Sequence, residues 1–208
     1  MSRSHKFWDR IANRYSKQPV ADEASYQKKL AVTREYLRPD MNVLELGCGT
    51  GSTAIAHSPF VEHITAIDVS SRMLEIAEAK ADAEGVSNVS FEHSAIDAFS
   101  RESASYDAVL ALSVLHLMDD RDRVIEKVHD LLKPGGVFVS STVSLGGTAL
   151  RFFGYVSPIG RFFGLLPLVK VFTPDELKAS ITRAGFSIDH QWQPGAGKAV
   201  FIVARKAA

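Results

Sequence analysis

The chain has 208 residues, a length that suits one domain with a sizeable core. Its 24 basic and 24 acidic residues cancel, and the sequence pI is near 7.1. Because a nucleic-acid binder needs a basic excess to neutralise phosphates, this balance argues against nucleic acid as a partner. The single cysteine, Cys48, excludes an intrachain disulfide, and we expect no metal site.

The amino terminus predicts no export signal. The segment MSRSHKFWDR is polar and charged and lacks the apolar core of a signal peptide. No run in the sequence reaches the roughly 18 apolar residues that a membrane-spanning helix needs. We therefore expect a cytoplasmic protein.

The first 40 residues are expected to form a helical cap. Apolar residues recur at helical spacing over 7–15 and again over 30–37, where Pro39 ends the second helix. From Val43 onward, short apolar runs alternate with amphipathic stretches. The predicted strands are 43–46, 63–68, 88–92, 106–112 and 137–142, and the predicted helices begin at 50 and span 71–84 and 124–132. This alternation implies parallel strands with right-handed crossovers, and hence an α/β, doubly wound sheet.

The carboxyl-terminal part predicts one helix and two strands. Thr173 to Glu176 has the pattern of a capping box, so a helix should begin there and stop at Gly185. Two runs, 186–192 and 198–206, flank a short PGAG turn and are expected to pair antiparallel. The whole is then a mostly parallel seven-stranded sheet with its last strand antiparallel. The expected parts of this single domain are the cap 1–40, a cofactor-binding core 41–142, an insertion 143–172, and the terminal helix and strand pair 173–208.

The insertion breaks this rhythm. It holds five of the fourteen glycines and repeats Arg-Phe-Phe-Gly at 151–154 and 161–164. One interpretation is an apolar lid that shapes a substrate pocket. The other is a peripheral membrane contact through 145–172, in which aromatic residues enter the interface and arginines meet anionic head groups. That second interpretation favours a lipid or quinone acceptor.

The clearest motif is VLELGCGTG at 43–51, at the end of a strand and the start of a helix. Glycine there allows a tight turn and lets a ligand approach the backbone without a Cβ in the way. Asp68 ends the next strand, 17 residues after Gly51, where a carboxylate can accept both hydroxyl hydrogens of a ribose. A nicotinamide enzyme is the weaker alternative, because Gly47-x-Gly49-x-Gly51 is not G-x-G-x-x-G and no Tyr-x-x-x-Lys pair follows.

Two further motifs complete a family resemblance. LKPGG at 132–136 precedes the fifth strand, and YDAVLALSVLHL at 106–117 covers the fourth strand and its exit. In order and spacing, residues 43–142 resemble the class I S-adenosylmethionine-dependent methyltransferases, which implies a Rossmann-like sheet. The resemblance also implies S-adenosylmethionine as cofactor and direct in-line methyl transfer to a small, apolar or aromatic acceptor.

The resemblance assigns roles to individual cofactor-binding residues. Glu45 would receive the amino group of the cofactor, and Asp68 would hold the ribose hydroxyls. The backbone beneath the methionine portion would be Gly47, Cys48 and Gly49, the side chains against the adenine would be Val69 and Met73, and a carbonyl near the amino group would come from Ser113. Family members often place Asp where this chain has Ala95. We therefore expect the backbone of Ile96 and the carboxylate of Asp97 to serve the adenine instead.

His116 is the predicted catalytic base, since LSVLHLM leaves the fourth strand near the expected methyl position. The alternative is that it packs under the lid and orients it. Tyr15 is predicted either to cover the methyl donor or to pack in the core. The other six histidines lack metal-ligand spacing and are expected to be surface residues or hydrogen-bonded structural ones. Beyond a small-molecule methyltransferase, a cofactor-binding protein without transfer activity remains a further alternative, and the oligomeric state is not predicted.

Overall fold

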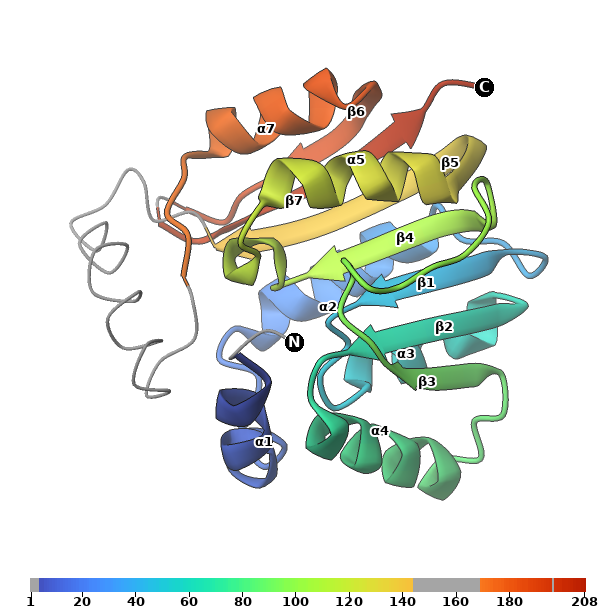
Figure 1. The fold of residues 1–208 in the computed structure, drawn as a ribbon, viewed down its shortest axis with the longest axis vertical. Helices are drawn as coiled ribbons and strands as arrows, with labels where there is room; N and C mark the ends of the chain where they lie inside the picture. The colour runs from blue at the N-terminus through green and yellow to red at the C-terminus, as the bar shows by residue number, and fades with distance from the viewer. Residues whose placement is uncertain (1–3, 144–168, 196) are drawn as a thin grey trace. The chain divides into compact units, whose positions relative to one another are not determined.

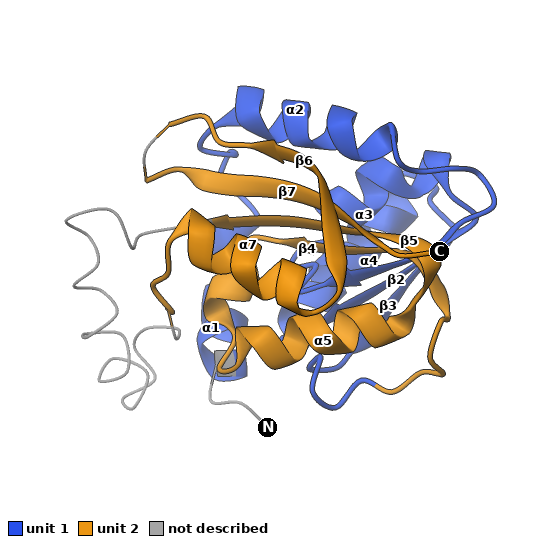
Figure 2. Cartoon of the chain, turned by 90° about the horizontal axis from the view of Figure 1, so that it is seen from above, with its two compact units in different colours: residues 1–99 blue, residues 100–208 orange. Residues whose placement is uncertain are grey.

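The computed structural model describes residues 4–143, 169–195 and 197–208. The chain divides into two compact units, residues 1–99 and residues 100–208 (Figure 2). Each unit alternates strands with helices, as the sequence pattern predicts.

The first unit holds three parallel strands. In chain order its elements are α1 (Ser4–Tyr15), α2 (Glu23–Arg34), β1 (Asn42–Leu46), α3 (Ser52–His57), η1 (Ser58–Phe60), β2 (His63–Asp68), α4 (Ser71–Ala83) and β3 (Val89–His93). Strand β2 lies between β1 and β3 and pairs in parallel with both. The carboxyl ends of the three strands therefore share one edge, where Glu45 and Asp68 stand on adjacent strands.

The second unit holds four strands. Its elements are β4 (Tyr106–Leu112), η2 (Leu115–Leu117), α5 (Arg121–Leu131), β5 (Leu132–Val143), α7 (Pro174–Arg183), β6 (Phe186–Trp192) and β7 (Ala199–Lys206). Strand β4 pairs in parallel with β5, whereas β7 is antiparallel to both β5 and β6. The predicted capping box is present, because Thr173 and Glu176 each accept a hydrogen bond from the other's backbone N–H.

The strand order is β3-β2-β1-β4-β5-β7-β6 (Figure 1). This is the predicted α/β, mostly parallel seven-stranded sheet with its last strand antiparallel. Most residues of β1, β2, β4 and β7 are buried, as expected for strands covered on both faces. The fold class is therefore confirmed.

Several element boundaries differ from the prediction. Helix α2 spans Glu23–Arg34, so it begins before the predicted 30–37 and ends before Pro39 is reached. Strand β5 begins at Leu132 instead of 137, and its pairing with β4 passes from Tyr106–Leu132 to Ala108–Val137. The LKPGG segment is thus an irregularity inside a strand instead of a turn before it. Helix α5 begins at Arg121, three residues before the predicted start, because the Asp120 side chain accepts the backbone N–H of Arg123 and caps the helix.

His57 departs from the expectation that the other six histidines are surface residues or hydrogen-bonded structural ones. His57, at the end of α3, is fully buried, and neither ring nitrogen has a hydrogen-bond partner among the described residues. Burial and, to a lesser degree, the charge of Arg34 lower the pKa of His57 to about 4. The ring is therefore neutral and packed in the core, and its prediction as a hydrogen-bonded residue is wrong.

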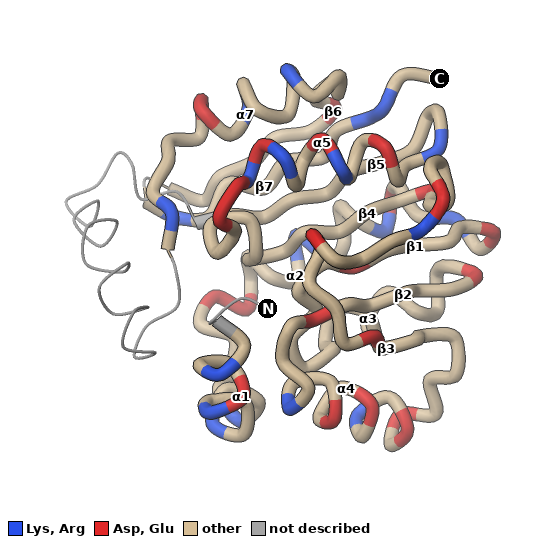
Figure 3. Tube along the Cα trace, viewed as in Figure 1, with Lys and Arg blue, Asp and Glu red and all other residues tan. Residues whose placement is uncertain are grey.

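Charges of both signs alternate along the helices. Arginine and lysine residues alternate with aspartates and glutamates along α4 and along α5 (Figure 3). Neither helix thus offers the single-sign stripe that tracks a phosphate backbone. Of the described helices, none combines the length and apolar character that crossing a membrane requires. Most of the predicted lid, 144–168, lies outside the described residues.

Gly51→Ala and Gly85→Ala form a matched pair, since both glycines have left-handed backbone, with φ of 75° and 68°. A Cβ on Gly51 would lie 2.8 Å from the Cβ of Ala77, whereas one on Gly85 meets nothing within 4 Å. The free energy of unfolding of both variants should fall by about 1–2 kcal/mol, because alanine is strained in left-handed backbone. That of Gly51→Ala should fall by about a further 1–3 kcal/mol from overpacking. Urea unfolding measures both, and equal losses would contradict the packing described.

Candidate functional site

The glycine-rich turn joins β1 to α3. The backbone N–H of Cys48 donates to Ile67 O at 3.1 Å, and that of Gly51 donates to Cys48 O at 3.0 Å. The first of these bonds ties the turn to β2 and the second closes the turn on itself. A Cβ on Gly49 would meet nothing within 4 Å. The turn therefore offers bare backbone next to open space at Gly49.

The Asp68 side chain holds the turn in place. One carboxylate oxygen accepts the backbone N–H of Gly49 and the other accepts that of Ser70, each at 2.9 Å. Burial raises the pKa of Asp68, while these backbone donors act in the opposite direction. The carboxylate thus links the end of β2 to the turn after β1, and its role toward a ribose remains a prediction.

Glu45 is a buried acid with one carboxylate oxygen left unpartnered by the described residues. Only 3% of it is exposed, and its Oε2 has no hydrogen-bond partner among the described residues. Burial and then the negative charge of Asp68 raise the pKa of Glu45 to about 8. Such a group favours a cationic ligand, because a cation supplies both the missing hydrogen bond and the missing charge.

Lys80 supports the turn from α4. Its Nζ donates to Thr50 Oγ1 at 3.0 Å and to Ser52 Oγ at 3.1 Å. Thr50 is in the turn and Ser52 begins α3, so this lysine joins α4 to both. Sequence reasoning missed Lys80, because the prediction used its position only as part of a helix face.

The predicted adenine contacts lie beside Asp68. Met73 is 2% exposed, and its backbone N–H donates to Ser70 Oγ at 3.1 Å. Val69 follows Asp68, and its carbonyl lies 3.0 Å from the Nε2 of His93. Ile96 is buried, whereas Asp97 is exposed. The roles of these residues toward adenine remain predictions.

Helix α1 is attached to the same corner of the first unit. Ser70 Oγ donates to Asp9 Oδ1 at 2.6 Å, directly after the Asp68 turn. Tyr15 at the end of α1 is 46% exposed and packs edge to face on Trp8, with ring centroids 6.2 Å apart. The core-packing interpretation of Tyr15 is therefore wrong, and its role in covering the methyl donor stays a prediction. Asp9 was missed, since nothing in the local sequence marks its distant partner.

The second unit contains the two remaining predicted residues. Ser113, just past β4, has a φ of 59°, and its N–H donates to Ser141 O at 2.6 Å. A serine in left-handed backbone is uncommon, and such strain gathers at functional sites. His116 lies in η2, and its carbonyl accepts the N–H of Lys170 at 2.7 Å.

The His116 imidazole is neutral and partly unpartnered. Burial lowers its pKa to about 4, and Nδ1 is buried without a hydrogen-bond partner in the part of the chain that the structure describes. A neutral ring is able to accept a proton. The bond to Lys170 also ties the histidine's backbone to the first described residues after 144–168. Both predicted interpretations, base and lid support, therefore stay open.

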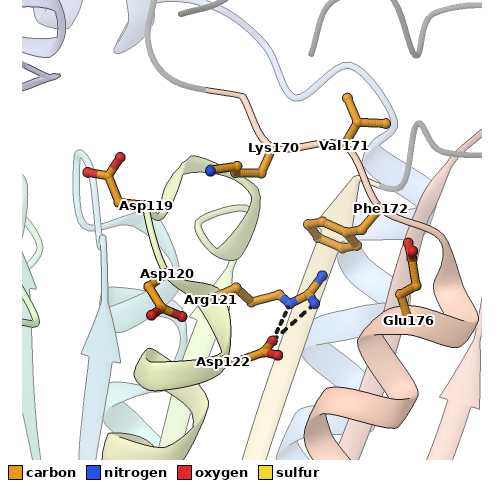
Figure 4. A pocket seen from close by; sticks show the side chains of 8 residues that line it. All are labelled: Asp119, Asp120, Arg121, Asp122, Lys170, Val171, Phe172 and Glu176. Atoms are coloured by element: carbon orange, nitrogen blue, oxygen red, sulfur yellow. Dashed lines mark hydrogen bonds and ion pairs between the residues drawn. The ribbon is translucent and has the colours of Figure 1, made fainter. Parts of the chain in front are cut away.

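A cavity of about 300 Å³ lies between the starts of α5 and α7 (Figure 4). Arg121 projects into it, pairs with Asp122 and lies 4.4 Å from the ring centroid of Phe172. The lining residues are Asp119, Asp120, Arg121, Asp122, Lys170, Val171, Phe172 and Glu176. Asp120 and Glu176 cap the two helices, and Arg121 pairs with Asp122. Four of the charged side chains that line this cavity are therefore already engaged in stabilising contacts.

Comparison with known proteins agrees with this geometry. Residues 43–136 match the family model described as "Methyltransferase domain". The chain is 33% identical over 104 residues to a ubiquinone biosynthesis O-methyltransferase of Methylocella silvestris, covering 50% of this chain and 40% of that protein. It is 28% identical over 187 residues to a demethylmenaquinone methyltransferase of Leptospira interrogans, covering 80% and 75%.

The fold is shared with solved structures. The crystal structure of the YcgJ protein of Bacillus subtilis superposes with a TM-score of 0.72 at 18% identity, covering 88% of this chain and 99% of that one. Residues 43–136 of the chain thus match a methyltransferase domain. These matches agree with the predicted family, enzyme class and cofactor. Because the chain spans 40% of the length of the first curated relatives it matches, the activity of the whole protein is a proposal.

Glu45→Gln should remove a pH dependence of stability. The raised pKa of Glu45 means that the folded protein favours its protonated form, so the stability present below about pH 4.5 is lost as pH rises toward 8. The loss should be on the order of 3–5 kcal/mol. Glutamine cannot ionise. In urea unfolding, the free energy of unfolding of the variant should therefore rise relative to that of the wild type between pH 5 and pH 8. Glu78→Gln, at an exposed position on α4, is the matched control. A constant difference between Glu45→Gln and wild type contradicts the burial argument.

Proposed function

We propose that this chain methylates a small, apolar or aromatic acceptor of the quinone type, with S-adenosylmethionine as donor. The observation that carries the proposal is the pair of buried acids beside an open glycine turn, within a matched methyltransferase domain. When bound, the cofactor supplies a methyl group already activated on a sulfonium, so the protein needs neither a metal nor a covalent nucleophile.

The residues present fit this cofactor. Glu45 has the unpaired oxygen that an ammonium requires, and Gly49 leaves the space that a methionine portion would fill. Asp68 still has lone pairs for ribose hydroxyls, since the bonds from Gly49 and Ser70 each occupy one lone pair on a different oxygen. Gly47, Cys48, Val69, Met73, Ile96, Asp97 and Ser113 would complete the contacts.

The choice of acceptor rests on similarity. Proteins related over 80% and 50% of this chain are named for demethylmenaquinone and for ubiquinone biosynthesis. An apolar quinol fits the aromatic composition of 143–172, although most of that segment lies outside the described residues. The alternative, membrane docking through 145–172, also concerns a segment that lies mostly outside the described residues.

In this mechanism the protein aligns the acceptor and excludes water. An oxygen acceptor must also lose its proton. We infer that His116 takes it, because its buried Nδ1 has no partner among the described groups and could accept a proton there. Tyr15 would cover the donor. A carbon acceptor needs less help from His116.

The function is tested by incubating the purified chain with methyl-labelled S-adenosylmethionine and a demethylated quinol, with a polar catechol as comparison. Label should enter the quinol in preference to the catechol. Cofactor binding without transfer to either compound, or to any metabolite of a cell extract, would leave a binding protein and contradict the proposal.

Asp68→Ala should weaken S-adenosylmethionine binding by about 1–3 kcal/mol, since it removes hydrogen bonds to a charged acceptor. Gly49→Val should do worse, because its side chain enters the open space beside the turn. Calorimetric titration measures both, with circular dichroism confirming that the variants fold. Unchanged affinity in both variants means that the site lies elsewhere.

His116→Gln should lower turnover of a hydroxyl acceptor by about 100-fold or more while leaving cofactor affinity unchanged. The glutamine retains a polar side chain of similar reach but cannot act as a base. Single-turnover rates with labelled cofactor measure the effect. If turnover stays within a few-fold of the wild type, His116 supports the lid or the fold and is not the base.

A further inference from the structure

The amino-acid end of S-adenosylmethionine carries two opposite charges. An α-ammonium needs an acceptor, and an α-carboxylate needs donors. Glu45 meets only the first of these needs, because a bound ammonium favours its ionised form, and an ionised carboxylate with a free Oε2 repels a second carboxylate. A site that binds this end therefore requires hydroxyl, amide or cationic donors close to Glu45.

Tyr26 places a hydroxyl at this point of the first unit. It lies on α2, and its Oη is 3.3 Å from Oγ1 of Thr53, two residues past Gly51. Burial raises the pKa of the Tyr26 phenol, and the nearby charge of Glu45 raises it further. The phenol is therefore a neutral donor in the electrostatic neighbourhood of Glu45.

The hydroxyl pair has one hydrogen to spare. Tyr26 and Thr53 carry one hydroxyl hydrogen each, and the bond between them uses one. The second remains for another acceptor. A carboxylate is the acceptor that strengthens such a bond most, because charge-assisted hydrogen bonds are the strong ones.

Helix α2 presents Tyr26 from a fixed position. Asp22 caps the helix by accepting the N–H of Ser25 at 3.1 Å. Further along, Arg34 donates from Nη2 to Ala56 O at 3.3 Å, so α2 is bonded to α3 at a second point. Two contacts along its length thus hold α2 against the helix that follows the glycine turn.

We infer that Tyr26 is a further cofactor-binding residue, whose hydroxyl, paired with Thr53, donates to the carboxylate at the amino-acid end while Glu45 accepts the ammonium. This inference rests on the proposed cofactor site and extends it to α2. Tyr26 lies outside both the matched family segment, 43–136, and the residues that the motifs assign.

Tyr26→Phe removes the hydroxyl and keeps the ring. The test titrates this variant and the wild type with S-adenosylmethionine and with 5′-methylthioadenosine, which lacks the amino-acid end. Affinity for S-adenosylmethionine should fall about tenfold, equivalent to about 1.4 kcal/mol, and affinity for 5′-methylthioadenosine should stay the same. Tyr36→Phe, which removes a phenol hydroxyl beyond the end of α2, is the matched control.

The outcomes separate the two proposals. If Tyr26→Phe weakens both ligands equally or neither, Tyr26 does not bind the amino-acid end and this inference fails while the cofactor site stands. If the wild type binds neither ligand, the proposed function itself fails. Thermal unfolding of Tyr26→Phe close to that of the wild type confirms that a selective loss comes from the ligand contact.

Discussion

The hydrogen bond from the Gly49 N–H to the Asp68 carboxylate is the constraint on which the candidate site depends. It joins the turn after β1 to the end of β2, two parallel neighbours whose carboxyl ends share one edge. Asp68 also accepts the N–H of Ser70, and Ser70 in turn donates to Asp9 of α1. The turn, the adjacent strand end and the first helix are thus held together through one carboxylate, which leaves the backbone at Gly49 exposed to a ligand.

Electrostatics then decides which ligand suits this edge. A dinucleotide site places a pyrophosphate on its glycine turn, and an ionised Glu45 beside the turn would repel it. Here Glu45 and Asp68 are both buried, and Glu45 has an oxygen without a partner among the described residues. Burying these acids without a counter-charge is unfavourable. A ligand with an ammonium and a sulfonium supplies that counter-charge, and its ribose supplies hydroxyl donors. Glu45, which disfavours a pyrophosphate at this turn, therefore favours the ammonium of S-adenosylmethionine, and this agrees with the matched domain.

Much of this could be predicted from local patterns. Strand β4 has the predicted bounds, and the capping box at Thr173 fixes the start of α7, because periodicity and capping act over a few residues. Long-range side-chain pairs leave no such pattern. The bonds of Asp9 to Ser70, Tyr26 to Thr53 and Lys80 to Thr50 join positions between 27 and 61 residues apart, so sequence reasoning missed them. The partnerless burial of His57 also depends on tertiary packing and went unpredicted.

The most direct measurement is a crystal structure of the protein grown with S-adenosylmethionine. We expect the Asp68 carboxylate within hydrogen-bond distance of the ribose hydroxyls, the ammonium at Glu45 and the methionine portion against the backbone of Gly49. A compound bound away from this edge, or an edge filled by the protein's own side chains, would contradict the assignment of the cofactor site and leave only the α/β fold.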